Sequence, residues 1–204
     1  MTSTPAPAPA PTKPTLADLI VTPEGIDDVI VGEPPRSENS ETALLTFVEG
    51  YCQPAIDSLI ELDGSEPGLS PDKWVANFEP ALSGQSDSPF AVAVVDGAIG
   101  LIVINDPDLR TAEGVGLGST RAELLAAYPN ATLAPGSIAN ASELYVVEGD
   151  HSRIEMEINL TNDVVGLEDA ALNTVWSFRV NDDEYEPTSW AGIDAGSSAT
   201  CVPA

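Results

Sequence analysis

A short phrase occurs twice in this chain of 204 residues, and it constrains the fold more than any other feature. Residues 22–26 read T-P-E-G-I and residues 111–115 read T-A-E-G-V. Apolar residues and a further glycine follow each copy. Two copies about 90 residues apart indicate one small unit used twice. The sequence therefore predicts a single domain, 16–204, built from two degenerate repeats at about 16–105 and 106–204.

Most of the remaining signal is typical of β-strands. Residues 90–95 and 98–104 are apolar runs on either side of Asp96 and Gly97, a dipeptide that supplies the positive φ angles of a two-residue hairpin turn. Both runs are apolar on both faces, so we expect this hairpin at the centre of a sheet. Further strands are expected at 144–147, 153–158, 174–180 and, ahead of Cys52, 43–48, where a short helix from Ser40 is the alternative.

Two of these strands have a pattern that predicts which side chains are buried. In 153–158 the even-numbered residues are apolar and are expected to face inward, while Arg153, Glu155 and Glu157 are expected to face solvent. In the last strand, the buried face is expected to consist of Trp176, Phe178 and Val180.

The clearest helix comes directly after the second copy of the phrase. Thr120 and Glu123 have the spacing of a capping box, Leu124 and Tyr128 lie one turn apart, and Pro129 ends the segment. Two turns are too few to be stable alone in water, so this helix must pack on the sheet. The predicted fold class is therefore α+β, a mostly antiparallel sheet with one or two short helices.

The two cysteines, Cys52 and Cys201, lack the C-x-x-C spacing and are too few for a structural zinc site. In an exported protein they would most simply form a disulfide that ties the end of the chain to its first third. Two buried free thiols are the alternative.

The charge balance limits the partners. The chain has 33 acidic and 7 basic residues and a formal net charge of -26, so it repels phosphate backbones and anionic lipid head groups. We expect no nucleic-acid partner and, because no apolar run reaches eighteen residues, no transmembrane segment. Such a charge suits a cationic partner, a divalent cation or a salty habitat, or simply keeps the protein soluble.

The N-terminal residues 1–15 are rich in proline and alanine and are expected to form a disordered, extended tether. Such tracts often come after the lipidated cysteine of a bacterial surface lipoprotein. A cysteine of that kind would precede the tract and is absent from this chain. The expected location is therefore extracellular, with a lipid anchor to the cell membrane.

Motifs that carry chemistry are weak in this sequence. The glycine run 114–120 lacks the lysine of a P-loop, so a strand-to-helix turn explains it better. His151 is not accompanied by a nucleophile motif, so a solvated turn explains it better than a catalytic base. Two oxygen-rich loops could hold calcium loosely, but neither has the ligand spacing of an EF-hand, and solvated turns explain them better. Their candidate ligands are Asp106, Asp108, Asp182 and Asp183.

The run 104–129, together with the phrase 25–32 and the cysteine downstream of it, resembles a family of largely uncharacterised secreted proteins and lipoproteins of actinobacteria. The resemblance implies export, an α+β fold and no assigned activity. More distantly, the glycine-then-capped-helix step is similar to the tandem units of the β-lactamase inhibitor protein and of small outer-membrane assembly lipoproteins, which bind proteins. No functional residue is carried over from either group.

Together these observations favour an exported cell-envelope protein that acts as a non-catalytic binding module, a monomer with an unknown protein or glycan partner. No catalytic residue, cofactor or complete catalytic constellation is assigned. The first alternative is a hydrolase that uses two carboxylates on a cell-wall or carbohydrate substrate, which would need at least one carboxyl with a raised pKa. The second is a calcium-stabilised structural module.

Overall fold

The computed structural model describes residues 12–36, 42–64, 70–78, 88–134, 142–161 and 172–184, together with Cys201. Residues 1–11 of the predicted tether lie outside this part of the chain. Within the predicted tether, Lys13 donates a hydrogen bond to the carbonyl of Asn77 and its ammonium lies 4.3 Å from the centroid of the Phe78 ring. A short 3-10 turn, η1 (Leu16–Asp18), then leads into the first strand.

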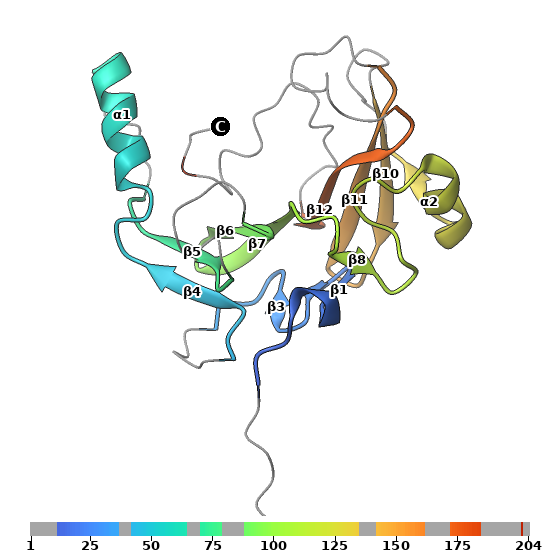
Figure 1. Ribbon diagram of the computed structural model, residues 1–204, viewed down its shortest axis with the longest axis horizontal. Helices are drawn as coiled ribbons and strands as arrows, with labels where there is room; N and C mark the ends of the chain where they lie inside the picture. The colour runs from blue at the N-terminus through green and yellow to red at the C-terminus, as the bar shows by residue number, and fades with distance from the viewer. Residues whose placement is uncertain are drawn as a thin grey trace, which may run out of the picture.

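An eight-stranded antiparallel sheet forms the body of the molecule (Figure 1), with the strand order β4-β5-β6-β7-β12-β11-β10-β9. The hairpin of β6 and β7 turns at Asp96 and Gly97, both with positive φ, and it lies inside the sheet as predicted. The bounds are β4 (Leu45–Val48), β5 (Lys73–Ala76), β6 (Phe90–Val95), β7 (Ala98–Ile104), β9 (Thr132–Leu133), β10 (Ser142–Glu148), β11 (Ser152–Asn159) and β12 (Val175–Asp182).

This sheet consists of two four-stranded meanders. Strands β4 to β7 pair in sequence order, and so do β9 to β12. The last strands of the two meanders join them, because β7 pairs with β12 in antiparallel fashion from Ile104 opposite Phe178 to Leu101 opposite Asn181. The α+β class with a mostly antiparallel sheet is confirmed.

A second, small sheet contains most of the first copy of the repeated phrase and the start of the second. Its order is β3-β2-β1-β8, with β1 (Ile20–Thr22), β2 (Gly25–Ile26), β3 (Val29–Ile30) and β8 (Arg110–Thr111). The first copy occupies β1 and β2 and the second begins in β8, and β1 and β8 pair in parallel with Val21 opposite Thr111. Two segments that are distant in the sequence therefore lie side by side.

The hydrophobic core lies between the small sheet and one face of the large one. Phe90, Ile102, Ile154 and Phe178 of the large sheet are completely buried there, with Ile26 of the small sheet. At about 1.5–3 kcal/mol for each fully buried large apolar side chain, this layer supplies most of the driving force for folding.

The prediction that the charged side chains of β11 face solvent is wrong. Arg153, Glu155 and Glu157 were expected to face solvent, but their exposure is 3%, 1% and 0%. Alternation along β11 correctly assigns these three residues to the face opposite the core. It does not indicate whether that face is itself covered, and this is why the prediction of exposure is wrong.

The prediction that Trp176 lies on the buried face of the last strand is also wrong, because of a β-bulge. The pairing of β11 with β12 shifts between Glu157 and Ile158, so that Val175 lies opposite Ile158 and Trp176 is the extra residue. Val175 therefore joins Phe178 and Val180 in the core, and Trp176 is only half-buried.

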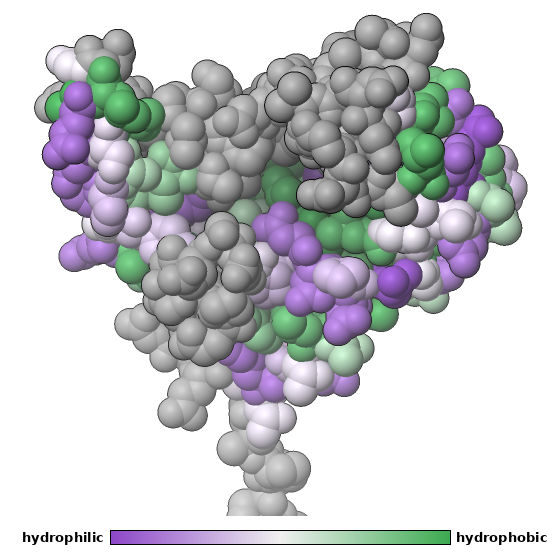
Figure 2. All heavy atoms as spheres, turned by 45° about the horizontal axis from the view of Figure 1, so that its top comes forward, coloured by the Kyte–Doolittle hydropathy of each residue, from purple (hydrophilic) through white to green (hydrophobic). Residues whose placement is uncertain are grey.

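Helix α2 (Arg121–Ala127) begins at the predicted capping box, in which Thr120 and Glu123 exchange hydrogen bonds, and its Leu124 is buried in the core. Sequence reasoning missed α1 (Gln53–Asp63), which stands apart from the sheets at the upper left of Figure 1. Its proline near the N-terminus and Gly64 at the C-cap are standard helix signals. Figure 2 shows hydrophilic residues along one side of α1 and hydrophobic residues beside them.

The predicted disulfide is confirmed. Cys52 at the start of α1 is bonded to Cys201, with a Cα–Cα distance of 5.0 Å and a sequence separation of 149 residues. The bond attaches the end of the chain to the first meander, beside β5, where the Cys52 amide also donates to the carbonyl of Pro71.

Candidate binding pocket

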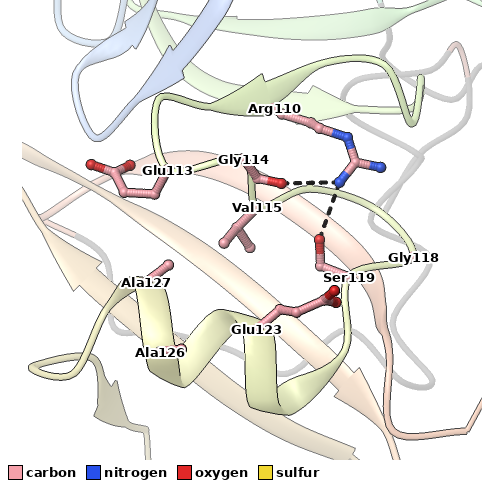
Figure 3. Close-up of a pocket in the computed structure, with 9 residues that line it drawn as sticks. All are labelled: Arg110, Glu113, Gly114, Val115, Gly118, Ser119, Glu123, Ala126 and Ala127. Atoms are coloured by element: carbon pink, nitrogen blue, oxygen red, sulfur yellow. Dashed lines mark hydrogen bonds between the residues drawn. The ribbon is translucent and has the colours of Figure 1, made fainter.

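A pocket of about 560 Å³ lies between the loop after β8 and helix α2 (Figure 3). Its size is within the range of small-molecule sites in proteins. Two glutamates, one arginine and several small residues line it. The lining residues are Arg110, Glu113, Gly114, Val115, Gly118, Ser119, Glu123, Ala126 and Ala127.

The loop that forms one wall is the second copy of the phrase. The Thr111 amide donates to the carbonyl of Val115 and the Thr111 hydroxyl accepts from the Val115 amide, which closes a tight turn. Gly114 has a φ of 83°, a conformation that favours glycine. The Ser119 hydroxyl accepts from the amide of Gly116, so the loop is fixed by bonds within itself.

The same loop is attached to the large sheet. The Gly118 amide donates to the carbonyl of Val175, and the Val175 amide donates to the carbonyl of Ser119, each at 2.8 Å. The glycine run 114–120 therefore forms the strand-to-helix turn predicted from the sequence, and it holds α2 against the start of β12.

Arg110 is held at one end of the pocket by neutral groups. Its Nη1 donates to the carbonyl of Gly114 at 3.0 Å and to the hydroxyl of Ser119 at 3.3 Å, as the dashed lines in Figure 3 show. The pairing of β8 with β1 fixes the backbone of Arg110 opposite Ile20. The guanidinium is thus positioned by neutral groups, and among the described residues no carboxylate lies at ion-pair distance from it.

The two glutamates of the pocket are held in their ionised form. A hydrogen bond from the Tyr128 hydroxyl lowers the pKa of Glu113. Hydrogen bonds from the backbone and hydroxyl of Thr120 lower the pKa of Glu123, with a smaller contribution from Arg110. Burial and the bond to Glu113 raise the pKa of Tyr128 to about 12, so this phenol stays protonated and donating.

A second polar cluster lies inside the protein. On the buried face of β11 and β12, Glu155 accepts from the Nε of Arg153 at 2.7 Å and from the guanidinium of Arg179, and Glu157 accepts from the hydroxyl of Ser142. Burial lowers the pKa of Arg179 to about 10, which leaves it charged at neutral pH. With exposures of 3% or less, these charges compensate one another and are not presented at a surface.

The four candidate calcium ligands lie in two separate turns. Asp106 accepts a hydrogen bond from the amide of Asp108, and Asp182 accepts one from the amide of Glu184, which is the bonding of Asx turns. Asp106 comes after the end of β7, whereas Asp182 pairs with Ser152 at the other end of β12, so the structure does not bring the two loops together. Asp183 is next to Asp182 in the same turn, where its amide approaches the carbonyl of His151. Among the described residues, no group of three or more His, Cys, Asp and Glu side chains could hold a metal ion.

His151 lies exposed in the turn between β10 and β11, as a solvated turn residue does. Sequence reasoning missed two pocket residues. Glu113 belongs to the second copy of the phrase, and Arg110 directly precedes that copy. The signal was present in the sequence, because a basic residue at the start of a duplicated phrase is notable in a chain with only 7 basic residues.

In the described part of the chain, no helix combines the length and the apolar character needed to cross a lipid bilayer. Comparison of the chain with protein-family models, with curated proteins and with solved structures finds no match. Function therefore has to be inferred from the geometry of the site.

Proposed function

We propose that this protein is an exported, non-catalytic binding module of the cell envelope and that the pocket beside α2 is its ligand site. The charged groups of the pocket are each fixed by a hydrogen bond within the protein and still have atoms free to contact a ligand. Such preorganisation reduces the entropic cost of binding.

The observation that carries this proposal is that hydrogen-bond donors hold both pocket carboxylates, the Tyr128 hydroxyl on Glu113 and the amide and hydroxyl of Thr120 on Glu123. A hydrolase that uses two carboxylates needs one of them protonated, with a raised pKa, to act as a general acid. Hydrogen bonds lower the pKa of Glu113 and of Glu123, so both favour the ionised form. Burial raises the pKa of Asp28, but this residue lies at the turn between β2 and β3 and does not line the pocket. The pocket is therefore suited to binding and not to acid catalysis.

Export is supported by the Cys52–Cys201 disulfide, because such bonds persist in oxidising compartments. The Pro/Ala-rich start of the chain and the resemblance to secreted actinobacterial lipoproteins point to the same location, with a lipid anchor ahead of the tract. The partner is then a protein or glycan of the cell envelope, and the module acts as a monomer.

We also propose that the two degenerate repeats correspond to the two meanders of the large sheet. The first repeat, 16–105, contributes β4 to β7, and the second, 106–204, contributes β9 to β12. The pairing of β1 with β8, which begin the two copies of the phrase, supports the same division. The ligand site then belongs to the second repeat alone.

A pull-down with a matched pocket variant tests the proposed function. The wild-type chain and the triple variant Arg110→Gln/Glu113→Gln/Glu123→Gln are immobilised and incubated with envelope extract of the source organism. The control is Arg121→Gln, which removes a nearby arginine that does not line this pocket. We expect a component that the wild type and the control retain and that the triple variant loses.

Equal retention by all three proteins would exclude the pocket as the ligand site. Turnover of an envelope polymer by the wild type, lost in the triple variant, would instead favour the carboxylate hydrolase. Circular dichroism of each variant verifies that the fold is intact.

A further inference from the structure

Helix α1 has an apolar stripe that is partly exposed. Ala55, Leu59 and Leu62 have the spacing i, i+4 and i+7, which places them along one side of the helix. Leu62 is 84% exposed, more than any other large hydrophobic side chain of the described residues, and Leu59 is half-buried. Ile56 is buried, but neither it nor any other described side chain of α1 belongs to the hydrophobic core between the two sheets. The stripe is therefore available to another molecule.

The charges of α1 oppose its own stability. Asp57 and Glu61 are exposed one turn apart on the other side of the helix, and like charges at this spacing repel each other. Glu61 is also in the last turn, where the negative end of the helix dipole repels it, and that turn contains no basic residue. An isolated helix of 11 residues is already marginal in water. A cationic group placed beside Glu61 relieves both repulsions.

The sequence around α1 has the same sign of charge. Between Arg36 and Lys73 the chain has eight acidic residues and no basic one. A second copy of this chain, or an anionic lipid surface, would bring further negative charge to the contact and is disfavoured. The charge therefore selects the basic surface of another protein.

The attachment of α1 leaves the helix presented to its surroundings. Cys52 directly precedes the helix, is bonded to Cys201 and donates its amide hydrogen to the carbonyl of Pro71. These bonds fix the N-terminal end of α1, and the helix then projects away from the sheets (Figure 1). Helix α2 lies on the opposite side of the molecule, and no residue of α1 lines the pocket beside α2. The surface of α1 is therefore separate from that pocket.

We infer that α1 is a docking element for a partner protein, with Leu59 and Leu62 in an apolar groove and Asp57 and Glu61 against basic residues at the rim of the groove. Recognition of an amphipathic helix in a groove uses apolar anchors at this spacing. The inference concerns a second surface and does not depend on the pocket.

An NMR titration of the full chain with designed helical peptides, at physiological ionic strength, tests the inference. The first peptide consists of two heptads of K-L-A-A-L-K-K. One matched analogue has glutamate in place of lysine, and the other has serine in place of leucine. We expect the first peptide to shift the amide signals of α1 and to slow their hydrogen exchange. Each analogue should bind at least about tenfold more weakly, because it lacks either the opposite charge or the apolar contact.

Two pairs of matched variants locate the contact. Leu62→Ser should weaken binding of the first peptide about tenfold, whereas Leu133→Ser removes an exposed leucine of β9 and should leave binding unchanged. Glu61→Gln should weaken binding about two- to threefold, and Glu148→Gln should leave it unchanged. All four side chains are exposed, so these variants retain the fold.

Equal binding by Leu62→Ser and Leu133→Ser would overturn the inference, because the peptide would then be attracted only by the net charge of the chain. Shifts that spread over the surface without involving α1 would overturn it as well, and so would the absence of binding by the first peptide. None of these outcomes bears on the pocket, which the pull-down with the triple variant tests separately.

Discussion

The two meanders of the large sheet differ on the face opposite the core. One row of directly paired residues crosses both of them, and in strands β5 to β7 of the first meander it is apolar, with Val75, Ala91 and Val103. In the second meander the same row continues with Arg179 and Glu155. The third strands show the contrast directly, since β6 places alanines on this face where β11 places charged residues.

The difference shows that similar strand frameworks allow different chemistry on the second face. On the core face both third strands carry large apolar side chains, such as Phe90 in β6 and Met156 in β11. The second face of β11 instead depends on internal neutralisation, because a buried charge without a partner costs several kcal/mol. The pocket arginine lies in the same half of the chain but has no acidic partner at ion-pair distance among the described residues.

The largest expected effect comes from removing the central acid of the buried cluster. Glu155→Gln leaves Arg153 and Arg179 buried without their shared carboxylate, and we expect it to lower the free energy of unfolding by about 3–5 kcal/mol. Urea unfolding at pH 7 measures this. The control Glu148→Gln, at the exposed end of β10, should change stability by less than about 0.5 kcal/mol. A loss in Glu155→Gln no larger than in the control would mean that the two meanders do not differ energetically on this face.

The two copies of the phrase give the second prediction. A Cβ on Gly25 would lie 2.0 Å from the carbonyl oxygen of Val29, whereas one on Gly114 would meet no atom within 4 Å. Gly25→Ala should therefore cost about 3 kcal/mol through clash and backbone strain. Gly114→Ala should cost about 1 kcal/mol, because only its positive φ of 83° opposes a side chain. Equal losses in thermal unfolding would show that the two glycines have the same role.

A third prediction concerns the segments downstream of the two copies. The second copy leads to α2, while the first leads to an irregular segment after Gly32 that contains Pro34 and Pro35. Thr120→Ala removes the cap of α2 and should cost about 1 kcal/mol, whereas Thr120→Ser keeps the hydroxyl and should cost less. Amide hydrogen exchange should show faster opening of α2 in the alanine variant. Unchanged exchange there would mean that packing of Leu124 alone holds the helix.

Local signals predicted six of the strands (β4, β6, β7, β10, β11 and β12), the hairpin turn, the capped helix and the disulfide, because each depends on a few neighbouring residues or on a single pair. The burial of Glu155 could not be predicted in this way, since it depends on whether a sheet face is covered. The displacement of Trp176 depends on a bulge in the pairing with β11, which a single strand does not encode. The pocket was missed for a related reason. Arg110, Glu113 and Glu123 meet only because the loop after β8 lies against α2.

The smallest expected effect is a pH dependence of opposite sign in the two halves. Hydrogen bonds lower the pKa of Glu123 below its ordinary 4.5, so its contribution to stability is present above that pH and is lost as the pH falls through the lower value. Burial raises the pKa of Asp28 above 3.8, so its ionisation opposes folding at neutral pH and this penalty disappears in acid.

Melting temperatures from pH 7 to pH 3 compare the wild type with Glu123→Gln and Asp28→Asn. At pH 7, Glu123→Gln should melt below the wild type and Asp28→Asn above it, and both differences should shrink toward pH 3. Comparison with the wild type at each pH cancels the general relief of repulsion as the other carboxylates of this acidic chain protonate. Differences of the same sign, or differences independent of pH, would show that the environments of these two acids do not differ as the structure indicates.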